Sequence, residues 1–341
     1  MADTQSNTNI AGTTTMTTSY RQNQTAPYGG LDPTIKMHYV RTLLENAEPK
    51  LVHLKYADEY PLPQGTGKRM EWRKFAKLPK ALTPLVEGVT PVGNSLNMST
   101  VEGEIYQYGD WIRLSDIVKL TALDNLIVQA TKQLGSQAGR TLDTVARETL
   151  HGGTSVRYAP KSSGAAVSVR SGLDGTCLLT PDLLLMAATD LDAMDNEGID
   201  GTEDYIAIVH PYAAYDLMRN EEWKDWQRRQ NSGRLYDREV GSVGRVHVIT
   251  TSEAKIWKDD TCPSGLAVFG TIVLSAHAYG KTELQGAGLE HIVKPLGAGE
   301  DPLNQRASVG WKSTLGVTRL NEDAMVRLEH CSKYSPTANA N

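Results

Sequence analysis

Residues 115–149 read SDIVKLTALDNLIVQATKQLGSQAGRTLDTVARET, and this stretch decides the fold. Its apolar side chains recur every three or four residues, a spacing that predicts one continuous amphipathic helix. At 1.5 Å per residue the helix would span roughly 50 Å, well beyond the average globular helix. Gly135 and Gly139 lie inside it and indicate either close backbone packing or a bend. The apolar positions are Leu120, Leu123, Ile127, Ala130, Leu134, Ala138, Leu142 and Val145.

The residues before this helix, 61–111, predict a long β-hairpin. Charged and apolar residues alternate from Arg69 to Arg73, which is typical of a strand, and residues 101–112 predict the returning strand. Pro79 and Pro84 lie between the two strands, where a missing backbone N–H ends strand pairing. Two interpretations are open: a solvated surface hairpin, or an arm that pairs with neighbouring copies of the chain.

Segregated charges favour pairing between copies, because complementary charges fix the register of two partners. Lys and Arg dominate residues 68–80, with Glu71 as the exception, whereas residues 81–110 hold acidic residues and no Lys or Arg. A second charged segment, 221–239, predicts either a solvated loop anchored by aromatic side chains or an inter-subunit loop. The candidate inter-subunit contacts are therefore Lys68, Arg69, Arg73, Lys74, Lys77, Lys80, Glu87, Glu102, Glu104, Trp223 and Trp226.

The first thirty residues have a different texture from the rest. They are rich in Thr and carry only Asp3 and Arg21 as charges, so alone they cannot bury enough apolar surface to offset their ordering entropy. We expect an arm held by a neighbouring subunit. Asp32 and Pro33 then predict the start of a first helix, which Pro49 ends.

The residues that follow the long helix predict a compact α/β unit. Thr180 is expected to cap a helix that has Pro181 at its first position and Gly198 past its end. An apolar strand, Tyr205–Val209, leads into a third helix that starts at His210-Pro211. Further strands are predicted at residues 243–250, 266–274, 290–293 and 324–328.

Composition excludes several classes of protein. The 341 residues carry 35 basic and 40 acidic side chains, so the net charge of −5 argues against a general nucleic-acid binder. No uninterrupted apolar run of about 20 residues predicts a membrane-spanning helix. The N-terminus lacks the charged start and apolar core of a secretory signal. Cys177, Cys262 and Cys331 form no CxxC pair, so buried or idle thiols are expected.

Signatures of enzyme chemistry fail on inspection. Residues 275–282 approach a phosphate-binding loop, but Ser275 replaces its first glycine, and Gly286 and Gly288 contradict the required helix. The pairs Gly286/Gly288 and Gly297/Gly299 each lack the third glycine of a dinucleotide fingerprint.

No other catalytic or metal-binding pattern is present in the sequence. It contains neither a G-x-S-x-G nor an H-E-x-x-H motif. His210, His247 and His277 lie in apolar settings and are expected to be core histidines rather than ligands. We therefore predict no catalytic, cofactor-binding or metal-binding residue.

Several short blocks, taken in order, resemble a tailed-bacteriophage major capsid protein, whose fold is shared with the herpesvirus capsid floor. The resemblance covers nearly the whole chain after the arm. Each block alone is weak, and their order makes them specific. The blocks are Pro84-Leu85-Val86-Glu87-Gly88-Val89-Thr90-Pro91, Tyr108-Gly109-Asp110, Leu114-Ser115-Asp116, Thr141-Leu142-Asp143, Val209-His210-Pro211-Tyr212, Asp301-Pro302-Leu303-Asn304-Gln305 and Val309-Gly310-Trp311-Lys312.

The resemblance implies an α+β fold with named parts. These are an N-terminal arm (1–31), an extended β-hairpin loop (61–111), and a peripheral domain with a long spine helix (32–60 and 112–177). An α/β axial domain (178–285) is followed by return strands to the peripheral domain and a C-terminal tail (286–341).

The resemblance also implies a structural function. Copies would self-assemble as pentamers and hexamers into an icosahedral head that encloses double-stranded DNA without sequence-specific binding. Portal and decoration or scaffolding proteins would be further partners, with no membrane and no cofactor. The protein would be synthesised and assembled in the host cytoplasm and reside in the virion. The alternatives are another self-assembling protein, such as an encapsulating shell or a tail-tube subunit, and an NTP-using enzyme built on Gly280-Lys281-Thr282.

Overall fold

A computed structural model describes residues 43, 45–47, 51–82, 84, 87–88, 90, 93–116, 126–229, 236–286, 288–297 and 303–341. The predicted arm, most of the predicted first helix and half of the Pro84–Pro91 block lie outside these residues. The chain divides into two compact units. Unit 1 comprises residues 1–51, 107–143 and 287–314, and unit 2 comprises residues 52–106, 144–286 and 315–341.

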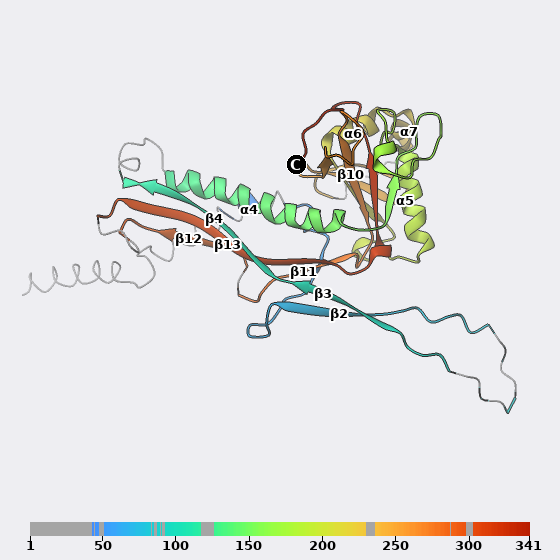
Figure 1. The fold of residues 1–341 in the computed structure, drawn as a ribbon, viewed down its shortest axis with the longest axis horizontal. Helices are drawn as coiled ribbons and strands as arrows, with labels where there is room; N and C mark the ends of the chain where they lie inside the picture. The colour runs from blue at the N-terminus through green and yellow to red at the C-terminus, as the bar shows by residue number, and fades with distance from the viewer. Residues whose placement is uncertain are drawn as a thin grey trace, which may run out of the picture. The chain divides into compact units, whose positions relative to one another are not determined.

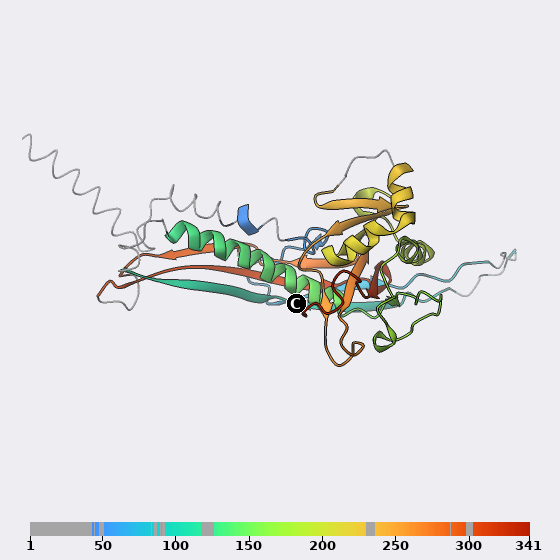
Figure 2. The same ribbon diagram turned by 90° about the horizontal axis from the view of Figure 1, so that it is seen from above.

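Unit 1 is built on the predicted long helix. The helix, α4 (Leu126–His151), is confirmed over its described length, and its residues up to Asp143 belong to this unit. Figures 1 and 2 both show α4 running along three strands: β4 (Tyr106–Ser115), β12 (Glu290–Lys294) and β13 (Arg306–Arg319). Both β12 and β4 pair with β13. The core between helix and strands consists of Leu43, Leu134, Ala138, Val309 and Trp311.

Glycines set the closest approaches in unit 1. A Cβ at Gly135 would lie 2.6 Å from the backbone oxygen of Leu43, so this helix glycine serves close packing. A Cβ at Gly109 of β4 would lie 2.7 Å from the backbone oxygen of Trp311, and one at Gly310 would lie 2.9 Å from Cβ of Trp111. Two of the sequence blocks that carry the resemblance therefore meet where β4 and β13 pair.

Unit 2 contains a seven-stranded sheet in the order β5-β14-β10-β6-β8-β7, with β9 paired to β10. The pairs β6·β8 and β5·β14 are parallel, and the others are antiparallel. The strands are β5 (Val156–Tyr158), β6 (Tyr205–Val209), β7 (Glu239–Val243), β8 (Val246–Thr250), β9 (Ile256–Trp257), β10 (Val268–Leu274) and β14 (Met325–His330).

The central strands of this sheet are buried on both faces, which explains their continuous apolar sequences. All five residues of β6 are buried. Tyr205, Ala207 and Val209 face a core shared with α5 (Pro181–Ala193) and α6 (Pro211–Arg219), whereas Ile206 and Ile208 face a second core. Thr180 caps α5 as predicted, since its hydroxyl accepts a hydrogen bond from the N–H of Leu183 at 3.3 Å.

Two predictions for unit 2 need correction. The segment 221–239 is a helix, α7 (Glu221–Arg229), before the strand β7, and not a loop throughout. The predicted returning strand of the hairpin is two strands. Only β3 (Met98–Glu104) pairs with β2 (Arg69–Phe75), whereas β4 leaves the hairpin to pair with β13.

Shorter elements complete the described part of the chain: β1 (Asp58–Glu59), β11 (Tyr279–Thr282), η2 (Arg170–Gly172), η3 (Ile199–Gly201) and η4 (Glu322–Ala324).

A buried ion cluster surrounds Glu329 of β14, a strand that lies between β5 and β10 in the seven-stranded sheet. The carboxylate of Glu329, which is fully buried, accepts hydrogen bonds from Nε and Nη2 of Arg170, both at 2.7 Å. Nε of Arg327 lies 2.9 Å from the same carboxylate without hydrogen-bond geometry. Both guanidinium groups lie over the ring of Trp257, at 4.1 Å for Arg170 and 5.7 Å for Arg327. Hydrogen bonding to Glu329 raises the pKa of Arg170.

Candidate assembly surfaces

The β2–β3 hairpin is the most exposed element of unit 2. Every described residue from Pro63 to Thr100 is exposed except Met70 and Trp72, which are half-buried. Large apolar side chains are among them: Phe75 is 55% exposed and Leu82 is 83% exposed. A two-stranded ribbon is marginally stable by itself in water, so this exposure favours a partner that covers it.

Trp72 anchors the base of the hairpin. Its ring packs edge-on against Tyr60, with 5.6 Å between the centroids. It also fills the space in front of Gly103, where a Cβ would lie 2.7 Å from the indole ring. The hairpin therefore has a fixed base and an exposed remainder.

The charged residues of the hairpin fall into different environments. Opposite charges face each other at Arg69 and Glu104, whereas two carboxylates face each other at Glu71 and Glu102. Like charges directly opposite each other destabilise a strand pair. The carboxylate of Glu71 also has a cation nearby, since its Oε1 lies 3.8 Å from Nε of Arg73. Lys68, Lys80 and Glu87 are exposed, whereas Lys74 and Lys77 contact other parts of unit 2.

The two tryptophans of α7 differ in exposure. Trp223 is 3% exposed and belongs to the core beneath α5 and α6, so its ring is an anchor within its own chain. Trp226, three residues on, is 37% exposed and is the one of the pair that a neighbour can reach.

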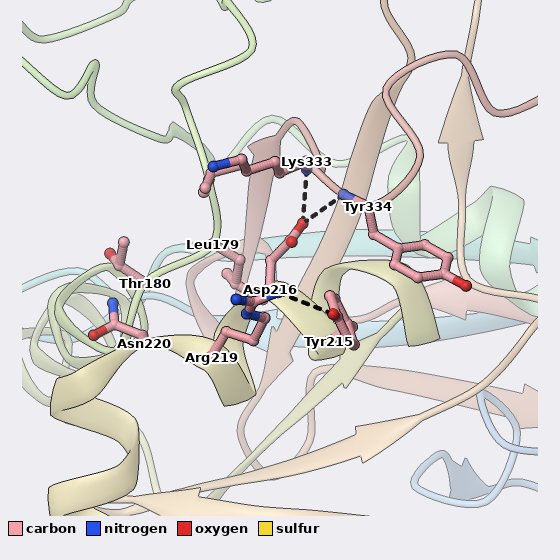
Figure 3. A pocket seen from close by; sticks show the side chains of 9 residues that line it. Leu179, Thr180, Tyr215, Asp216, Arg219, Asn220, Lys333 and Tyr334 are labelled. Carbon is pink, nitrogen blue, oxygen red and sulfur yellow. Dashed lines mark hydrogen bonds between the residues drawn. The ribbon is translucent and has the colours of Figure 1, made fainter.

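A pocket of about 510 Å³ lies between α6 and the C-terminal residues (Figure 3). The carboxylate of Asp216 accepts hydrogen bonds from the backbone N–H of Lys333 at 2.8 Å and of Tyr334 at 3.5 Å. Nη1 of Arg219 donates to the hydroxyl of Tyr215 at 3.1 Å. The polar groups of this pocket thus bind each other and hold the C-terminal segment against α6.

The segment that approaches a phosphate-binding loop also has structural partners. Residues 279–282 form the strand β11, and Nζ of Lys281 lies 2.6 Å from the carboxylate of Glu59. The phosphate-loop alternative therefore lacks both the loop and a free lysine. Among the described residues, no cluster of His, Cys, Asp and Glu has the geometry to hold a metal ion. No helix among them is long and apolar enough to cross a membrane.

Of the three histidines predicted to be core residues, His210 is buried, His247 is largely buried and His277 is exposed. His210 is buried and caps α6, since its Nδ1 accepts a hydrogen bond from the N–H of Tyr212 at 3.2 Å. His247 is also largely buried, with Nδ1 2.7 Å from Glu239. His277 was expected to be a core residue, and this is wrong: its side chain is 72% exposed and paired with Asp58 at 2.7 Å. The turn after β10 places it at the surface with a φ of 57°.

Comparison with known proteins identifies a common fold. The model of a family described as phage capsid protein matches residues 99–328. The chain is similar to the capsid of Ralstonia phage GP4, with 13% identity, a TM-score of 0.64, and 84% of this chain and 89% of that chain covered.

Two cyanophage capsids are also similar in structure to this chain. For P-SCSP1u the identity is 16% and the TM-score is 0.61, covering 82% of this chain and 87% of that chain. For Pam1 the identity is 13% and the TM-score is 0.61, covering 84% and 92%. A search of the curated proteins finds no match. The expected capsid fold is confirmed.

Proposed function

The chain belongs to the phage capsid protein family, and from this premise we propose that many copies, as pentamers and hexamers, close into the icosahedral head of a tailed phage around double-stranded DNA. A phage capsid protein is a structural component of the virion, so the expectation of a non-enzyme is confirmed. A shell is made by self-association, so the first partner of this chain is a second copy. The observation that carries the proposal is the family match, which includes α4, β13 and most of the seven-stranded sheet.

The division into capsid domains is part of the proposal. The seven-stranded sheet with α5, α6 and α7 supports an axial domain near residues 178–285, and α4 with β4, β12 and β13 supports a peripheral domain. Two details favour different bounds for the axial domain. β11 pairs with β1 and β13 and takes no part in the seven-stranded sheet, which favours an end before residue 279. β5 and β14 join that sheet from outside residues 178–285, which favours their inclusion.

The further partners are also proposals. Portal and decoration or scaffolding proteins would complete such a head. The net charge of −5 suits a container for DNA, because a strongly basic lining would bind phosphates by counterion release and hinder packing and ejection.

Electron microscopy of the purified product in negative stain tests the proposal. Closed angular shells are the expected result. Tubes would favour a tail-tube subunit, and small discrete particles would contradict self-assembly into a shell.

The extended hairpin is proposed to contact a neighbouring subunit through its outward basic residues. Substituting Lys68, Arg69 and Arg73 together by Glu is expected to block shell formation while the subunit keeps its circular dichroism spectrum. Substitution of the same three residues by Gln serves as the matched control, because it removes the charges without reversing them and should give a weaker defect. Normal shells from the Glu variant would refute this role.

The N-terminal arm is proposed to latch neighbouring subunits. Deleting residues 2–25 is expected to lower the temperature at which particles release DNA more than the melting temperature of the free subunit. Equal shifts in the two temperatures would remove the case for a latch.

A further inference from the structure

We infer that Lys74 and Lys77 do not reach a neighbouring subunit but hold the hairpin against other parts of unit 2 of their own chain, and thereby set the direction in which the hairpin extends. This inference rests on the proposed function, since direction matters only if the hairpin contacts another copy. Of the basic residues of the hairpin, Lys74 and Lys77 would then position the hairpin, and the others would face outward.

Lys77 binds the C-terminal end of α5. Its Nζ donates a hydrogen bond to the backbone oxygen of Met194 at 3.2 Å and lies 3.3 Å from Oδ2 of Asp195. Met194 is the C-cap residue of α5, and Asp195 follows with a φ of 56°, the left-handed conformation that commonly ends a helix. The last carbonyls of a helix lack intrahelical donors and carry partial negative charge, so a cation is well placed there.

Lys74 binds a second helical terminus. Its Nζ donates to Oδ1 of Asn321 at 2.5 Å and lies 4.0 Å from Oδ2 of Asp323. Asn321 is the N-cap of η4, and its Oδ1 also accepts from the N–H of Asp323 at 3.3 Å. The lysine is therefore held by a side chain that the fold has already oriented.

The two anchor points are joined to each other. Nδ2 of Asn196, the residue after Asp195, donates to the backbone oxygen of Asp323 at 2.7 Å. The end of α5 and the start of η4 therefore form one surface, which we call the clip site and define as Met194, Asp195, Asn321 and Asp323. Lys74 is in β2 and Lys77 follows its end, so two points along one strand are fixed to one surface. Two fixed points on β2 and the residues after it define the direction of the hairpin, whereas a single contact would let the hairpin rotate about it.

Exposure determines what these contacts contribute. The side chains of Lys77 and Asp195 are 77% and 87% exposed, and those of Lys74 and Asp323 are 47% and 63% exposed. Exposed ion pairs add little to the free energy of unfolding. Their loss should therefore lower the free energy of unfolding only slightly, while it removes the two contacts that favour one direction of the hairpin. A small change in stability together with an altered direction separates positioning from a general effect on stability.

Zero-length crosslinking tests the contacts in the free subunit. A carbodiimide joins a lysine amine to a carboxylate only when the two are in direct contact. Applied to a dilute mixture of ¹⁵N-labelled and unlabelled subunits, it is expected to give Lys77–Asp195 crosslinks within single chains. Lys77→Arg is the control that keeps the charge but removes the reactive amine. Crosslinks that join labelled to unlabelled chains, or no crosslink at this pair, would overturn the inference.

Assembly tests the consequence. Lys74→Ala with Lys77→Ala is expected to give particles that lose the single diameter of the wild type, with an almost unchanged melting temperature of the free subunit. Lys74→Arg with Lys77→Arg keeps a cation and hydrogen-bond donors at both positions and is expected to retain one diameter. Uniform particles from the first variant would overturn the inference. Failure of the wild type to form shells would instead refute the proposed function.

Discussion

The buried carboxylate of Glu329 gives the sharpest prediction for the stability of the subunit. Replacement by Gln keeps the shape of the side chain but leaves two guanidinium groups near it, those of Arg170 and Arg327, which are 17% and 13% exposed. Breaking a buried ion pair in this way costs about 3–5 kcal/mol, because an uncompensated charge remains in a poorly solvated site. We therefore expect Glu329→Gln to lower the free energy of unfolding by about that amount.

The chain offers a matched control with the same geometry and different burial. Nε and Nη2 of Arg157 donate to Asp190 at 2.8 and 2.7 Å, as those of Arg170 do to Glu329. Arg157 and Asp190 are 39% and 38% exposed, so Asp190→Asn should cost less than about 1 kcal/mol. Urea unfolding of the free subunit, followed by circular dichroism, measures both. Similar losses in the two variants would refute the argument that burial decides the effect.

Three further predictions concern the same subunit. Gly135→Ala should lower the melting temperature although Ala favours helices, because its Cβ would lie 2.6 Å from the backbone oxygen of Leu43; a gain would contradict this packing. Burial lowers the pKa of His210 and of His330 from 6.5 to about 4, so stability that is complete above pH 6.5 should fall toward pH 4, by about 1.4 kcal/mol per pH unit per group. His210→Asn with His330→Gln should reduce the fall of the urea midpoint across that range, and the remaining fall would include His151 and His291, whose pKa burial also lowers. An unchanged slope would assign the whole loss to other groups. Asp216→Ala should cost about 0.5–1.5 kcal/mol in urea unfolding, because it removes hydrogen bonds that the carboxylate accepts from Ser332 and Lys333 of the C-terminal segment; an unchanged midpoint would show that these contacts add nothing.

Periodic and capped elements could be predicted from the sequence. α4 was predictable because its apolar spacing is uninterrupted, and α5 because Thr180 and Pro181 mark its start. The strand β6 was predictable as an apolar run, although its burial on both faces depends on neighbours far along the chain.

Elements shaped by tertiary contacts could not be predicted. β13 was missed because Gly310, Gly316 and its polar residues interrupt the alternation, although Gly310 lies where β4 approaches closely. α7 was taken for a loop because its composition is almost entirely polar, and the burial of Trp223 depends on a core that the local sequence does not reveal.

The clip site had no sequence signal. Lys74 and Asn321 are 247 positions apart, and nothing in the local sequence of either residue indicates the other. The segregated charges did point to the hairpin as a place of electrostatic contact. They could not separate contacts within the chain from contacts between chains, because a charge pattern specifies the type of partner and not which chain supplies it.

The strand order of the seven-stranded sheet has a consequence for the timing of folding. Its interior strands include β10 and β14. β14 pairs with β5, and this pairing places Val156 opposite Arg327, two residues that are far apart in the sequence. Pairings so distant in sequence form slowly, because a long loop must close before they are made. On the ribosome, both buried layers of the sheet stay open until β14 has emerged. A nascent chain therefore cannot present a finished subunit to completed ones, and the order of synthesis itself delays assembly until translation has passed the last strand.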